Sequence, residues 1–360
     1  MKTDYLLLED GTTFEGKICG AIDCEALGEV VFNTSMSGYQ EILTDPSYAG
    51  QIVTMTYTQI GNYGVNNRDV ESSKVHCKGM IVRELSEISS NFTSTLSLEQ
   101  YFIKNNIACM SEIDTRALTR YLRDKGALKG IFVKASDLKE EQILKLEAFD
   151  YDKIDFSIEV AGLQKNSDYT NENGRPKVAV LDFGIKNNIL RILSQFCNVE
   201  VFSLKEWQSL NAIDEYDGFF LSNGPGDPAA VVGAKESIQA ILATNKPVFG
   251  ICLGHQLLSL SLGAKTYKLK FGHHGANHPV KNLKSERVEI SSQNHGFAVE
   301  AESLPNGIIA THINLNDGSL AGLELENKPV YSIQYHPESA PGPHDANYLF
   351  DKFATDLGVK

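Results

Sequence analysis

Long apolar runs are missing from this sequence of 360 residues. The N-terminal apolar run covers only residues 6–8 before Glu9 and Asp10 interrupt it, which is far shorter than the core of a signal peptide. No stretch approaches the ~18 consecutive apolar residues of a membrane-spanning helix. We therefore expect neither a secretion signal nor a membrane anchor.

Paired cysteines are also missing. The six cysteines are scattered along the chain, at positions 19, 24, 77, 109, 197 and 252. No Cys-x-x-Cys spacing occurs among them, which argues against zinc ribbons and against a disulfide framework. Such cysteine usage fits a reducing compartment, and we expect a cytoplasmic protein.

Basic charge is in deficit. The chain has 33 lysines and arginines against 46 aspartates and glutamates, which gives a formal net charge of -13. Because phosphate backbones repel an acidic chain, we expect no nucleic-acid partner. A phosphate-binding loop is absent as well, since the pattern Gly-x-x-x-x-Gly-Lys-[Ser/Thr] occurs nowhere in the sequence.

What the sequence does contain is the composition of a globular protein, with 42% hydrophobic and 22% charged residues. A chain of this length exceeds one ordinary hydrophobic core, so two domains are expected. The segment 164–176 is polar and rich in turn-forming residues, which is typical of a linker. We predict a first domain at residues 1–165, a linker at 166–176 and a second domain at 177–360.

The first domain mixes strand patterns with helix patterns. Short β-type runs occupy residues 29–33 and 51–57. The segment Ser97-Leu-Glu-Gln100 has the form of a capping box that opens a helix. Asp114 is placed to cap another helix, which would stop at Gly126. These patterns predict an α+β domain.

The second domain alternates strands with helices. Residues 177–182, 218–221 and 247–251 are continuous apolar runs, as expected of parallel strands buried on both faces. Helical periodicity follows the first run, at 189–196, and appears on both sides of the third. We therefore predict an α/β fold in which an open, mostly parallel sheet is flanked by helices. Such sheets place their chemistry at the carboxyl ends of the strands.

A cysteine motif follows the third of these runs. Gly250-Ile-Cys252-Leu-Gly254 has the form of a nucleophile elbow, with sulfur in place of the serine oxygen. A tight strand-to-helix turn leaves little room for side chains at the flanking positions, and the helix N-terminus favours a thiolate. A lone cysteine at a strand end is more often a buried structural residue. The two glycines reverse that preference and indicate a nucleophile.

A histidine and a glutamate follow the last apolar run of the chain, in His336-Pro-Glu338. A thiol nucleophile needs a base, and the base needs a group that orients it. His336 could accept the thiol proton and later deliver it to a leaving nitrogen, while Glu338 holds the imidazole. Taken alone, the pair could equally be a histidine and a glutamate at the surface. Together with the elbow it predicts a catalytic triad.

A loop rich in glycine and proline, Ser222-Asn-Gly224-Pro-Gly226-Asp-Pro228, follows the strand predicted at 218–221. Such a loop brings bare backbone N–H groups close to a ligand. The N–H groups of Gly224 and Leu253 could together form an oxyanion hole. Seen alone, the segment would be an ordinary turn.

Two further polar segments lie in the predicted second domain. Gln293-Asn294-His295-Gly296-Phe297 is, by itself, a loop closed by an aromatic residue. The histidines at 273, 274 and 278 have a spacing that could ligate zinc. No carboxylate or cysteine accompanies them, and a cysteine nucleophile needs no metal. We therefore predict no metal site.

Taken together, the motifs of the second domain resemble class I, triad-type glutamine amidotransferases. The hallmarks of that family correspond to Asn223-Gly-Pro-Gly226, Gly250-Ile-Cys-Leu-Gly-His-Gln256 and His336-Pro-Glu338. The resemblance implies the class I amidotransferase fold for this domain. Because such domains serve many synthetases, it does not identify the product.

The first domain narrows the resemblance. The run at 32–54 resembles the small subunits of carbamoyl-phosphate synthetases, as do Ile60-Gly-Asn-Tyr-Gly64, Asp114-Thr-Arg-Ala-Leu-Thr-Arg120 and Phe271-Gly-His-His-Gly275. The resemblance spans essentially the whole chain. It shows no departure at a catalytic position.

Membership of that family implies roles for individual residues. Cys252 would be the nucleophile, and His336 and Glu338 its partners. The positions that match the family's glutamine contacts are Ser47, Gly224, Gly226, Leu253, Gln256, Asn294, Gly296 and Phe297.

The resemblance also implies a heterodimeric partner, a large synthetase subunit on a separate polypeptide. That partner would receive ammonia through an internal tunnel and would use ATP, Mg and bicarbonate to make carbamoyl phosphate for arginine or pyrimidine biosynthesis. No cofactor is expected on this chain, whose substrate would be L-glutamine.

Three other interpretations remain open at this point. An amidotransferase subunit of another synthetase, such as anthranilate synthase, shares the second domain but does not account for residues 1–150. A standalone glutaminase would lack the large partner. A binding module that has lost its chemistry would lack part of the triad, and no member of the triad is missing.

Overall fold

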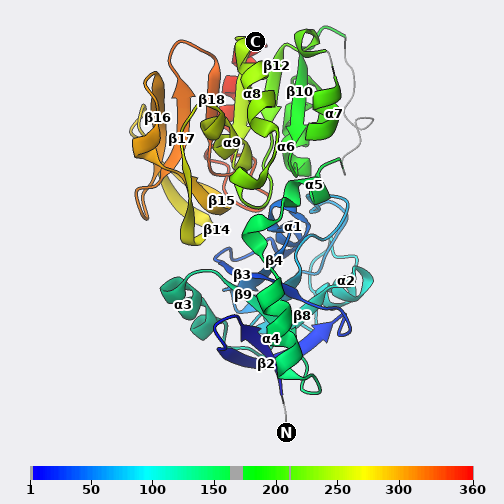
Figure 1. Cartoon of the computed structure of the whole chain (residues 1–360). Coiled ribbons are helices and arrows are strands. Elements are labelled where there is room, and N and C mark those ends of the chain that lie inside the picture. Colours follow the sequence, from blue (N-terminus) through cyan, green and yellow to red (C-terminus); the bar gives the residue numbers. More distant parts are fainter. Residues whose placement is uncertain (1–2, 163–172, 211, 360) are drawn as a thin grey trace. The chain divides into compact units, whose positions relative to one another are not determined.

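The computed structural model describes residues 3–162, 173–210 and 212–359 of the chain, which forms two compact units (Figure 1). Unit 1 comprises Met1–Ile154 together with Lys270–Gly275. Unit 2 comprises Asp155–Leu269 and Ala276–Lys360.

The boundary between the units differs from the predicted one. The sequence placed the end of the first domain at residue 165, whereas unit 1 ends at Ile154. Helix α5 (Phe156–Val160) already belongs to unit 2, and just beyond it the N–H of Gly162 donates to the Asp182 carboxylate at 2.8 Å. Of the linker predicted at 166–176, residues 166–172 lie outside the described residues, and 173–176 lead into the first strand of unit 2.

Unit 1 is built around a closed barrel. Its strands are β1 (Asp4–Leu8), β2 (Thr13–Gly20), β3 (Leu27–Asn33), β4 (Gln51–Met55), β6 (Gly79–Ile81), β8 (Ala108–Ser111) and β9 (Leu128–Val133). They follow the order β1-β2-β8-β6-β4-β3-β9, and pairing of β9 with β1 closes the barrel. The neighbours among β3, β4, β6 and β8 are parallel, and the other pairs are antiparallel. A separate small sheet pairs β5 (Gln59–Ile60) with β7 (Glu84–Leu85).

The barrel strands contribute to two separate clusters of buried side chains. Ile52 of β4 packs in one cluster with Met110 of β8, whereas the neighbouring Val53 packs in another with Cys109 and Leu98. This division follows from strand geometry, because successive side chains point to opposite faces. The runs predicted at 29–33 and 51–57 are confirmed as β3 and β4.

Four α-helices of unit 1 lie within the first 154 residues: α1 (Tyr39–Thr44), α2 (Leu98–Lys104), α3 (Thr115–Lys125) and α4 (Lys139–Ala148). The predicted capping box is confirmed, since the Ser97 hydroxyl accepts from the N–H of Gln100 and the Gln100 amide oxygen accepts from the N–H of Ser97. The Asp114 side chain accepts from the N–H of Ala117 at 2.9 Å. Helix α3 ends, as predicted, at Gly126, whose φ is 112°.

Unit 2 is built on one large sheet. Its strands are β10 (Lys177–Asp182), β11 (Asn198–Ser203), β12 (Gly218–Leu221), β13 (Val248–Ile251), β14 (Thr266–Asn282), β15 (Val288–Val299), β16 (Ile308–Asn314), β17 (Leu320–Leu325) and β18 (Val330–Ile333). Their order is β11-β10-β12-β13-β18-β17-β16-β14-β15. The strands from β11 to β18 in this order pair in parallel, which confirms the predicted parallel sheet. Beyond β18, the pairs β18–β17, β17–β16 and β16–β14 are antiparallel, an extension that the sequence did not predict.

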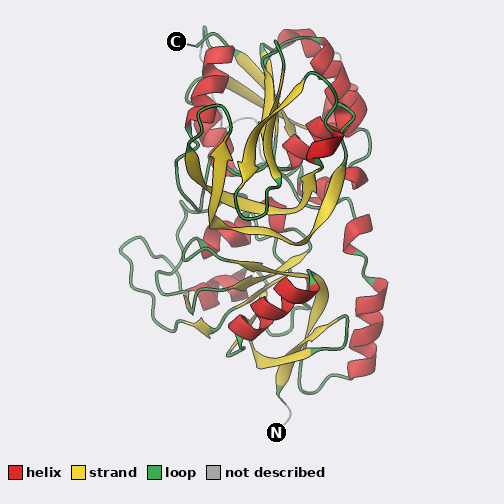
Figure 2. Ribbon diagram, turned by 90° about the vertical axis from the view of Figure 1, so that its left-hand side faces the viewer, coloured by secondary structure: helices red, strands yellow, loops and turns green. Residues whose placement is uncertain are grey.

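Helices cover both faces of this sheet, as Figure 2 shows. They are α6 (Asn187–Leu193), α7 (Leu204–Ser209), α8 (Ala234–Ala243), α9 (Leu253–Ser261) and α10 (Tyr348–Asp356). On one face, Leu190 of α6 and Phe350 of α10 share a buried cluster with Phe249 of β13. On the other face, α7, α8 and α9 pack around Phe219 of β12, with Trp207 among the buried residues. The predicted α/β sheet flanked by helices is confirmed.

Strand β14 supplies residues to both units, because Lys270–Gly275 belongs to unit 1. Within unit 1, the carbonyl of Lys270 accepts from the N–H of Ala127 at 2.9 Å, and the carbonyl of His274 accepts from the N–H of Thr34 at 3.1 Å. The ring of Phe271 stacks on that of Phe32 with a centroid separation of 5.6 Å. Unit 1 therefore depends on a segment that lies far along the chain from the rest of it.

Within residues 3–162, 173–210 and 212–359, none of the helices combines the length and the apolar character needed to cross a bilayer.

Candidate active site

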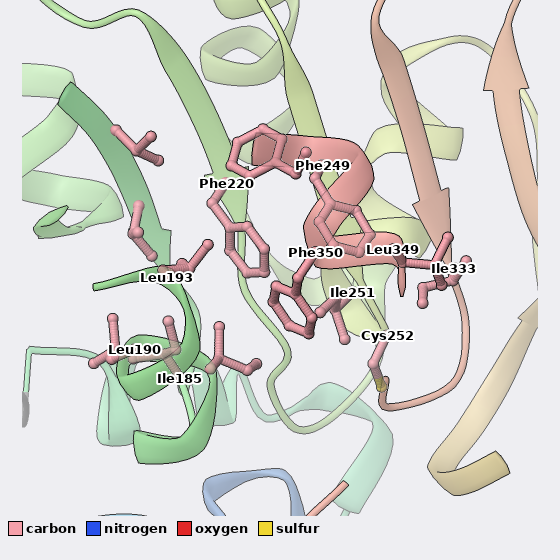
Figure 3. Close-up of a cluster of buried hydrophobic side chains, with 14 of the residues drawn as sticks. Ile185, Leu190, Leu193, Phe220, Phe249, Ile251, Cys252, Ile333, Leu349 and Phe350 are labelled. Carbon is pink, nitrogen blue, oxygen red and sulfur yellow. The ribbon is translucent and has the colours of Figure 1, made fainter. Parts of the chain in front are cut away.

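Cys252 occupies the turn between strand β13 and helix α9 (Figure 3). Its φ of 53° and ψ of -105° place a non-glycine residue in a sparsely populated backbone region, which costs on the order of 1–3 kcal/mol. Its N–H donates to the carbonyl of Ile333 at 2.9 Å. Figure 3 shows Cys252 at the end of the strand that carries Phe249 and Ile251. The strained turn is the elbow that the sequence predicts.

The glycines that flank Cys252 are required by close contacts. A Cβ on Gly254 would lie 2.2 Å from the carbonyl oxygen of Leu221, and one on Gly250 would lie 3.0 Å from the carbonyl of Gly254. The first contact is far too close for any side chain, because the obstacle is backbone. These distances confirm the steric reason for the Gly-x-Cys-x-Gly pattern.

His336 and Glu338 form a buried pair beyond the neighbouring strand β18. The imidazole Nδ1 and the Glu338 Oε1 are 2.6 Å apart, and both side chains are almost completely buried. Strands β13 and β18 are parallel neighbours in which Ile251 lies opposite Ile333. The chain therefore leaves the sheet toward Cys252 and toward His336 at the same edge. The N–H of His336 is fixed by a 2.9 Å hydrogen bond to the carbonyl of Ser292.

The second nitrogen of the imidazole, Nε2, is buried and makes no hydrogen bond with any of the described residues. Because Nδ1 faces Glu338, Nε2 is the atom left to exchange protons with sulfur or with a substrate. The Sγ of Cys252 lies 3.5 Å from the carbonyl oxygen of Asn294, to which the thiol can donate. This arrangement suits a base that is held on one side and reactive on the other.

Electrostatics favour the charged forms of both members of the pair. Burial alone would lower the pKa of His336, but the Glu338 carboxylate outweighs it and, with the neighbouring Cys252, raises the pKa above the usual histidine value. Burial would raise the pKa of Glu338, but Lys186 and His336 lower it below the usual glutamate value. An imidazolium held in this way stabilises negative charge that develops on the sulfur.

Lys186 is a residue that the sequence reasoning missed. Its Nζ lies 3.0 Å from Oε1 of Glu338, and both side chains are almost fully buried. Its backbone N–H donates to the Asn223 side chain at 3.2 Å. The Nδ2 of Asn188 donates to the backbone carbonyl of Glu338. A lysine shortly after the carboxyl end of a buried strand was a usable signal, because such positions face the active edge of an α/β sheet.

The glycine-rich loop after β12 meets the start of α9. The N–H of Gly254 donates to the carbonyl of Ser222 at 2.9 Å. A Cβ on Gly224 would lie 2.8 Å from Leu253 Cδ2 and 2.3 Å from the carbonyl oxygen of Phe183. Gly226 has a φ of 85°, a conformation that favours glycine. The structure thus brings Gly224 beside Leu253, and their oxyanion role stays a prediction.

Strand β15 lies against the same site. The carbonyl of Asn294 faces the sulfur of Cys252, and the carbonyl of Phe297 accepts from Nε2 of Gln256 at 2.8 Å. At Gly296, an added Cβ would meet no atom within 4 Å, so space is open there. Gln256, Asn294, Gly296 and Phe297 are four of the predicted glutamine contacts. All four lie in unit 2, as the triad does. The segment 293–297, interpreted from sequence alone as a loop, is part of a strand.

Ser47 belongs to unit 1. It lies in a short 3₁₀ turn, Pro46–Tyr48, where its N–H donates to the Asp45 carboxylate at 2.9 Å. The side chain is buried. Its role as a glutamine ligand stays a prediction.

The comparisons with known families agree with this geometry. Residues 179–355 match the family model described as glutamine amidotransferase class-I. Unit 2, with its parallel sheet and its thiol at a strand-to-helix elbow, is therefore a class I glutamine amidotransferase domain. Residues 6–132 match the model described as carbamoyl-phosphate synthase small chain, CPSase domain.

Curated relatives extend the match to nearly the whole chain. The chain is 50% identical to the carbamoyl phosphate synthase small chain of Vibrio vulnificus (strain YJ016), over 98% of this chain and 97% of that one. The small chain of Syntrophotalea carbinolica is 50% identical over 97% and 96%, and that of Salmonella typhimurium is 48% identical over 98% and 97%. The chain belongs to the carbamoyl-phosphate synthase small-chain family.

Proposed function

We propose that this chain hydrolyses glutamine to glutamate and ammonia and supplies the ammonia to a large synthetase subunit. That subunit would make carbamoyl phosphate from bicarbonate, ammonia and ATP, for arginine biosynthesis, pyrimidine biosynthesis or both. The observation that carries the proposal is Cys252 at the elbow, at the same sheet edge as the buried His336–Glu338 pair. The six free thiols also fit the cytoplasmic location that the sequence predicts.

The chemistry follows from the arrangement of these three side chains. The Cys252 sulfur attacks the carboxamide carbon of glutamine as a thiolate, beside a His336 imidazolium that carries the proton on Nε2. The N–H groups of Gly224 and Leu253 stabilise the oxyanion of the tetrahedral intermediate. Collapse breaks the C–N bond, His336 protonates the leaving nitrogen, and ammonia departs from a glutamyl thioester.

The second half of the reaction reverses these roles. His336 removes a proton from water, and the resulting hydroxide attacks the thioester carbon. The C–S bond breaks, glutamate leaves, and the Cys252 thiolate and the His336 imidazolium are restored. Glu338, itself held by Lys186, keeps the imidazole oriented and stabilises its charge through both steps.

The proposed glutamine contacts of unit 2 come from the loop after β12, from helix α9 and from strand β15. We assign this role to Ser47, Gly224, Gly226, Leu253, Gln256, Asn294, Gly296 and Phe297. Ser47→Ala should raise the KM for glutamine by about 2- to 10-fold, the effect of one lost hydrogen bond, with little change in kcat. An unchanged KM would remove Ser47 from the set.

The glutaminase reaction itself needs no cofactor. ATP, Mg and bicarbonate would be used by the large partner. This division of labour gives a direct test.

The test is to co-purify the chain with the large synthetase subunit and to measure carbamoyl phosphate with glutamine or with ammonium as nitrogen donor. Cys252→Ala should abolish glutamine-dependent synthesis, because the nucleophile is gone, and should leave ammonium-dependent synthesis near the wild-type rate. A wild-type chain that hydrolyses glutamine but binds no such subunit would instead be a standalone glutaminase or serve another synthetase. Full glutamine-dependent activity in Cys252→Ala would show that Cys252 is not the nucleophile.

A further inference from the structure

Cys19 and Cys109 lie directly opposite one another on the antiparallel neighbours β2 and β8 of the unit 1 barrel. Directly opposed residues point to the same face of a sheet, and both cysteines belong to the side of the barrel strands that packs with Leu98 and Phe102. The N–H of Ala21 donates to the carbonyl of Ile107 two positions along the same ladder. Cys19 and Cys109 are therefore a hydrogen-bonded pair, with Cα atoms about 5.5 Å apart. Disulfides span Cα separations of about 4.4–6.8 Å.

The two thiols differ in access and in acidity. Cys109 is fully buried, whereas Cys19 is partly exposed. Hydrogen bonding with Cys109 lowers the pKa of Cys19 despite its partial burial, and Ser111 adds to this effect. Burial raises the pKa of Cys109 well above the usual thiol value. A partly exposed, more acidic thiol beside a protonated partner is the arrangement of a reactive cysteine and its resolving cysteine.

We propose that Cys19 and Cys109 form a redox modification site, at which a hydroperoxide converts the two thiols into a reversible disulfide. The Cys19 thiolate attacks one oxygen of hydrogen peroxide and the O–O bond breaks. Hydroxide leaves, and Cys19 becomes a sulfenic acid. The sulfur of Cys109 then attacks the sulfur of Cys19, the S–O bond breaks, and the thiol proton leaves with the hydroxide as water. The two thiols supply two electrons, and a dithiol reductant returns them.

The geometry also indicates that the disulfide is labile. In a hydrogen-bonded pair the Cβ atoms lie near the upper end of the ~4.5–5.5 Å range, whereas a disulfide prefers ~3.5–4.5 Å. Forming the bond therefore draws β2 and β8 together. A bond formed under such strain is reduced easily, which suits a reversible modification.

The remaining cysteines lack this arrangement. Cys77 and Cys197 are buried, and burial raises the pKa of both thiols. Cys24 is partly exposed and its thiol lies 3.7 Å from the carbonyl oxygen of Glu25, which makes it a matched control. Cys252 is the proposed nucleophile, so its own oxidation would abolish glutaminase activity. A loss of activity therefore does not measure the oxidation of Cys19 and Cys109.

The experiment is peptide mapping by mass spectrometry without reduction, on the full chain after brief treatment with a small excess of hydrogen peroxide and alkylation of free thiols. The expected product is a cross-linked peptide pair containing Cys19 and Cys109, which disappears on treatment with dithiothreitol. Cys24→Ser should form the cross-link like the wild type, and Cys19→Ser should form none. In Cys109→Ser, Cys19 should accumulate as a sulfenic acid that a dimedone probe traps.

Two results would overturn the proposal. One is a wild-type chain in which Cys19 stays alkylated to the same extent as Cys24 after peroxide treatment. The other is a cross-link that joins Cys19 to Cys24. Because the wild-type map alone decides both, the test does not depend on whether Cys109→Ser folds.

A different surface of unit 1 carries an independent inference. A groove of about 890 Å³ is lined by Arg83, by Arg116, Arg120 and Arg123 of helix α3, by the N-cap residue Asp114 and by four threonines. Positions 116, 120 and 123 share one face of the helix. Arg123 contacts Asp124 at 3.2 Å, whereas Arg83, Arg116 and Arg120 form no ion pair with the carboxylates of the described residues. Unpaired like charges on one face are unfavourable, and here they gather on a chain whose net charge is -13.

We infer that this groove docks an acidic segment of the large synthetase subunit, an inference that rests on the proposed function. Guanidinium groups bind carboxylates through paired N–H donors, which gives orientation as well as charge. A local positive surface on an acidic protein also speeds the encounter with an acidic partner at low salt.

The test is the rate of association between the chain and the large subunit at low and high ionic strength. The double variant Arg116→Glu/Arg120→Glu should associate about 10-fold more slowly, or worse, at low salt, with a smaller loss at high salt. Lys205→Glu/Lys235→Glu makes the same change in charge on exposed positions of unit 2 and should stay within about 2-fold of the wild type. Glutamine hydrolysis by the isolated chain should be unchanged in both.

The outcomes separate this surface from the proposed function. If the wild type binds the large subunit and the arginine variant binds equally fast, the docking inference is overturned and the proposed function stands. If the wild type binds no large subunit, the proposed function fails. If inorganic pyrophosphate binds to the wild type but not to the arginine variant, while assembly is unaltered, the groove belongs to a small anion and the docking inference is overturned.

Discussion

At the scale of single residues, the ion pairs around Glu338 determine how the site responds to substitution. Glu338 contacts His336 through Oε1 and lies 3.0 Å from Nζ of Lys186, in a place with almost no exposure to solvent. Removing Glu338 leaves the buried positive charges of His336 and Lys186 without their carboxylate, which is costly. Substitutions at Glu338 therefore act on stability as well as on catalysis.

His336→Asn should lower kcat for glutamine by about 10²–10⁴-fold, because it removes the proton-transfer group. Glu338→Gln should cause a smaller loss in kcat, because it removes only the orienting carboxylate. Steady-state glutamate production by both variants decides this, with thermal unfolding as the control, since Glu338→Gln also removes the carboxylate that faces Lys186. Equal losses, or a larger loss in a Glu338→Gln chain that is still folded, would contradict the assigned roles.

The raised pKa of His336 makes a prediction about stability. A group whose folded-state pKa lies above its unfolded value stabilises the fold fully below the unfolded pKa of ~6.5 and loses that contribution as the pH rises through the folded pKa, here about 10. The advantage of the wild type over His336→Asn in the free energy of unfolding should therefore shrink by at least about 1 kcal/mol between pH 6 and pH 10. Denaturant titrations of both chains at several pH values measure it, and a constant difference would contradict the raised pKa.

At the scale of helices and strands, features that depend on neighbouring residues could be predicted from the sequence. Features that depend on residues far apart in the chain could not. The capping box at Ser97 and the elbow at Cys252 were predicted correctly, because each depends on residues within one turn. Closure of the barrel depends on β1 meeting β9, two strands separated by most of unit 1, and no local pattern records that pairing. Lys186 was missed for the same reason, since its partner Glu338 lies far along the sequence.

The antiparallel extension of the unit 2 sheet was also unpredictable. Strands β14 to β17 lack the continuous apolar runs of the central parallel strands, and burial is interrupted along β14, β15 and β16. Half-buried strands of this kind give a weak periodic signal. The segment 293–297 was therefore interpreted as a loop until the structure placed it in β15.

The elbow makes a prediction about the β13–α9 connection as a unit. Gly254→Ala places a Cβ 2.2 Å from the carbonyl oxygen of Leu221, so helix α9 or strand β12 must shift. A shift of about 1 Å at a catalytic residue can cost on the order of 100-fold in rate. Gly250→Ala, whose Cβ would meet its nearest neighbours at 3.0 Å, should be milder in both kcat and thermal stability. The reverse order in the two variants would contradict the steric account.

At the scale of the whole molecule, the segment Lys270–Gly275 links the folding of the two units. A fragment containing only residues 155–360 would carry Phe271 without Phe32, and the carbonyls of Lys270 and His274 without their donors. We expect this fragment to aggregate when expressed alone and to become soluble when residues 1–154 are co-expressed. Soluble yield and size-exclusion chromatography test this, and a monomeric, soluble fragment obtained alone would show that unit 2 folds independently.

The strand segment that unit 1 takes from the middle of β14 has a consequence for how such a gene can change. The coding regions of the two units are interleaved, so a single recombination event near the linker cannot exchange one complete unit for another. A mosaic gene made in this way would pair one barrel with a strand segment inherited from a different parent. We therefore expect three contacting segments to be inherited together from one parent, even where the remaining surface of either unit diverges. They are residues 32–34, 126–127 and 270–275.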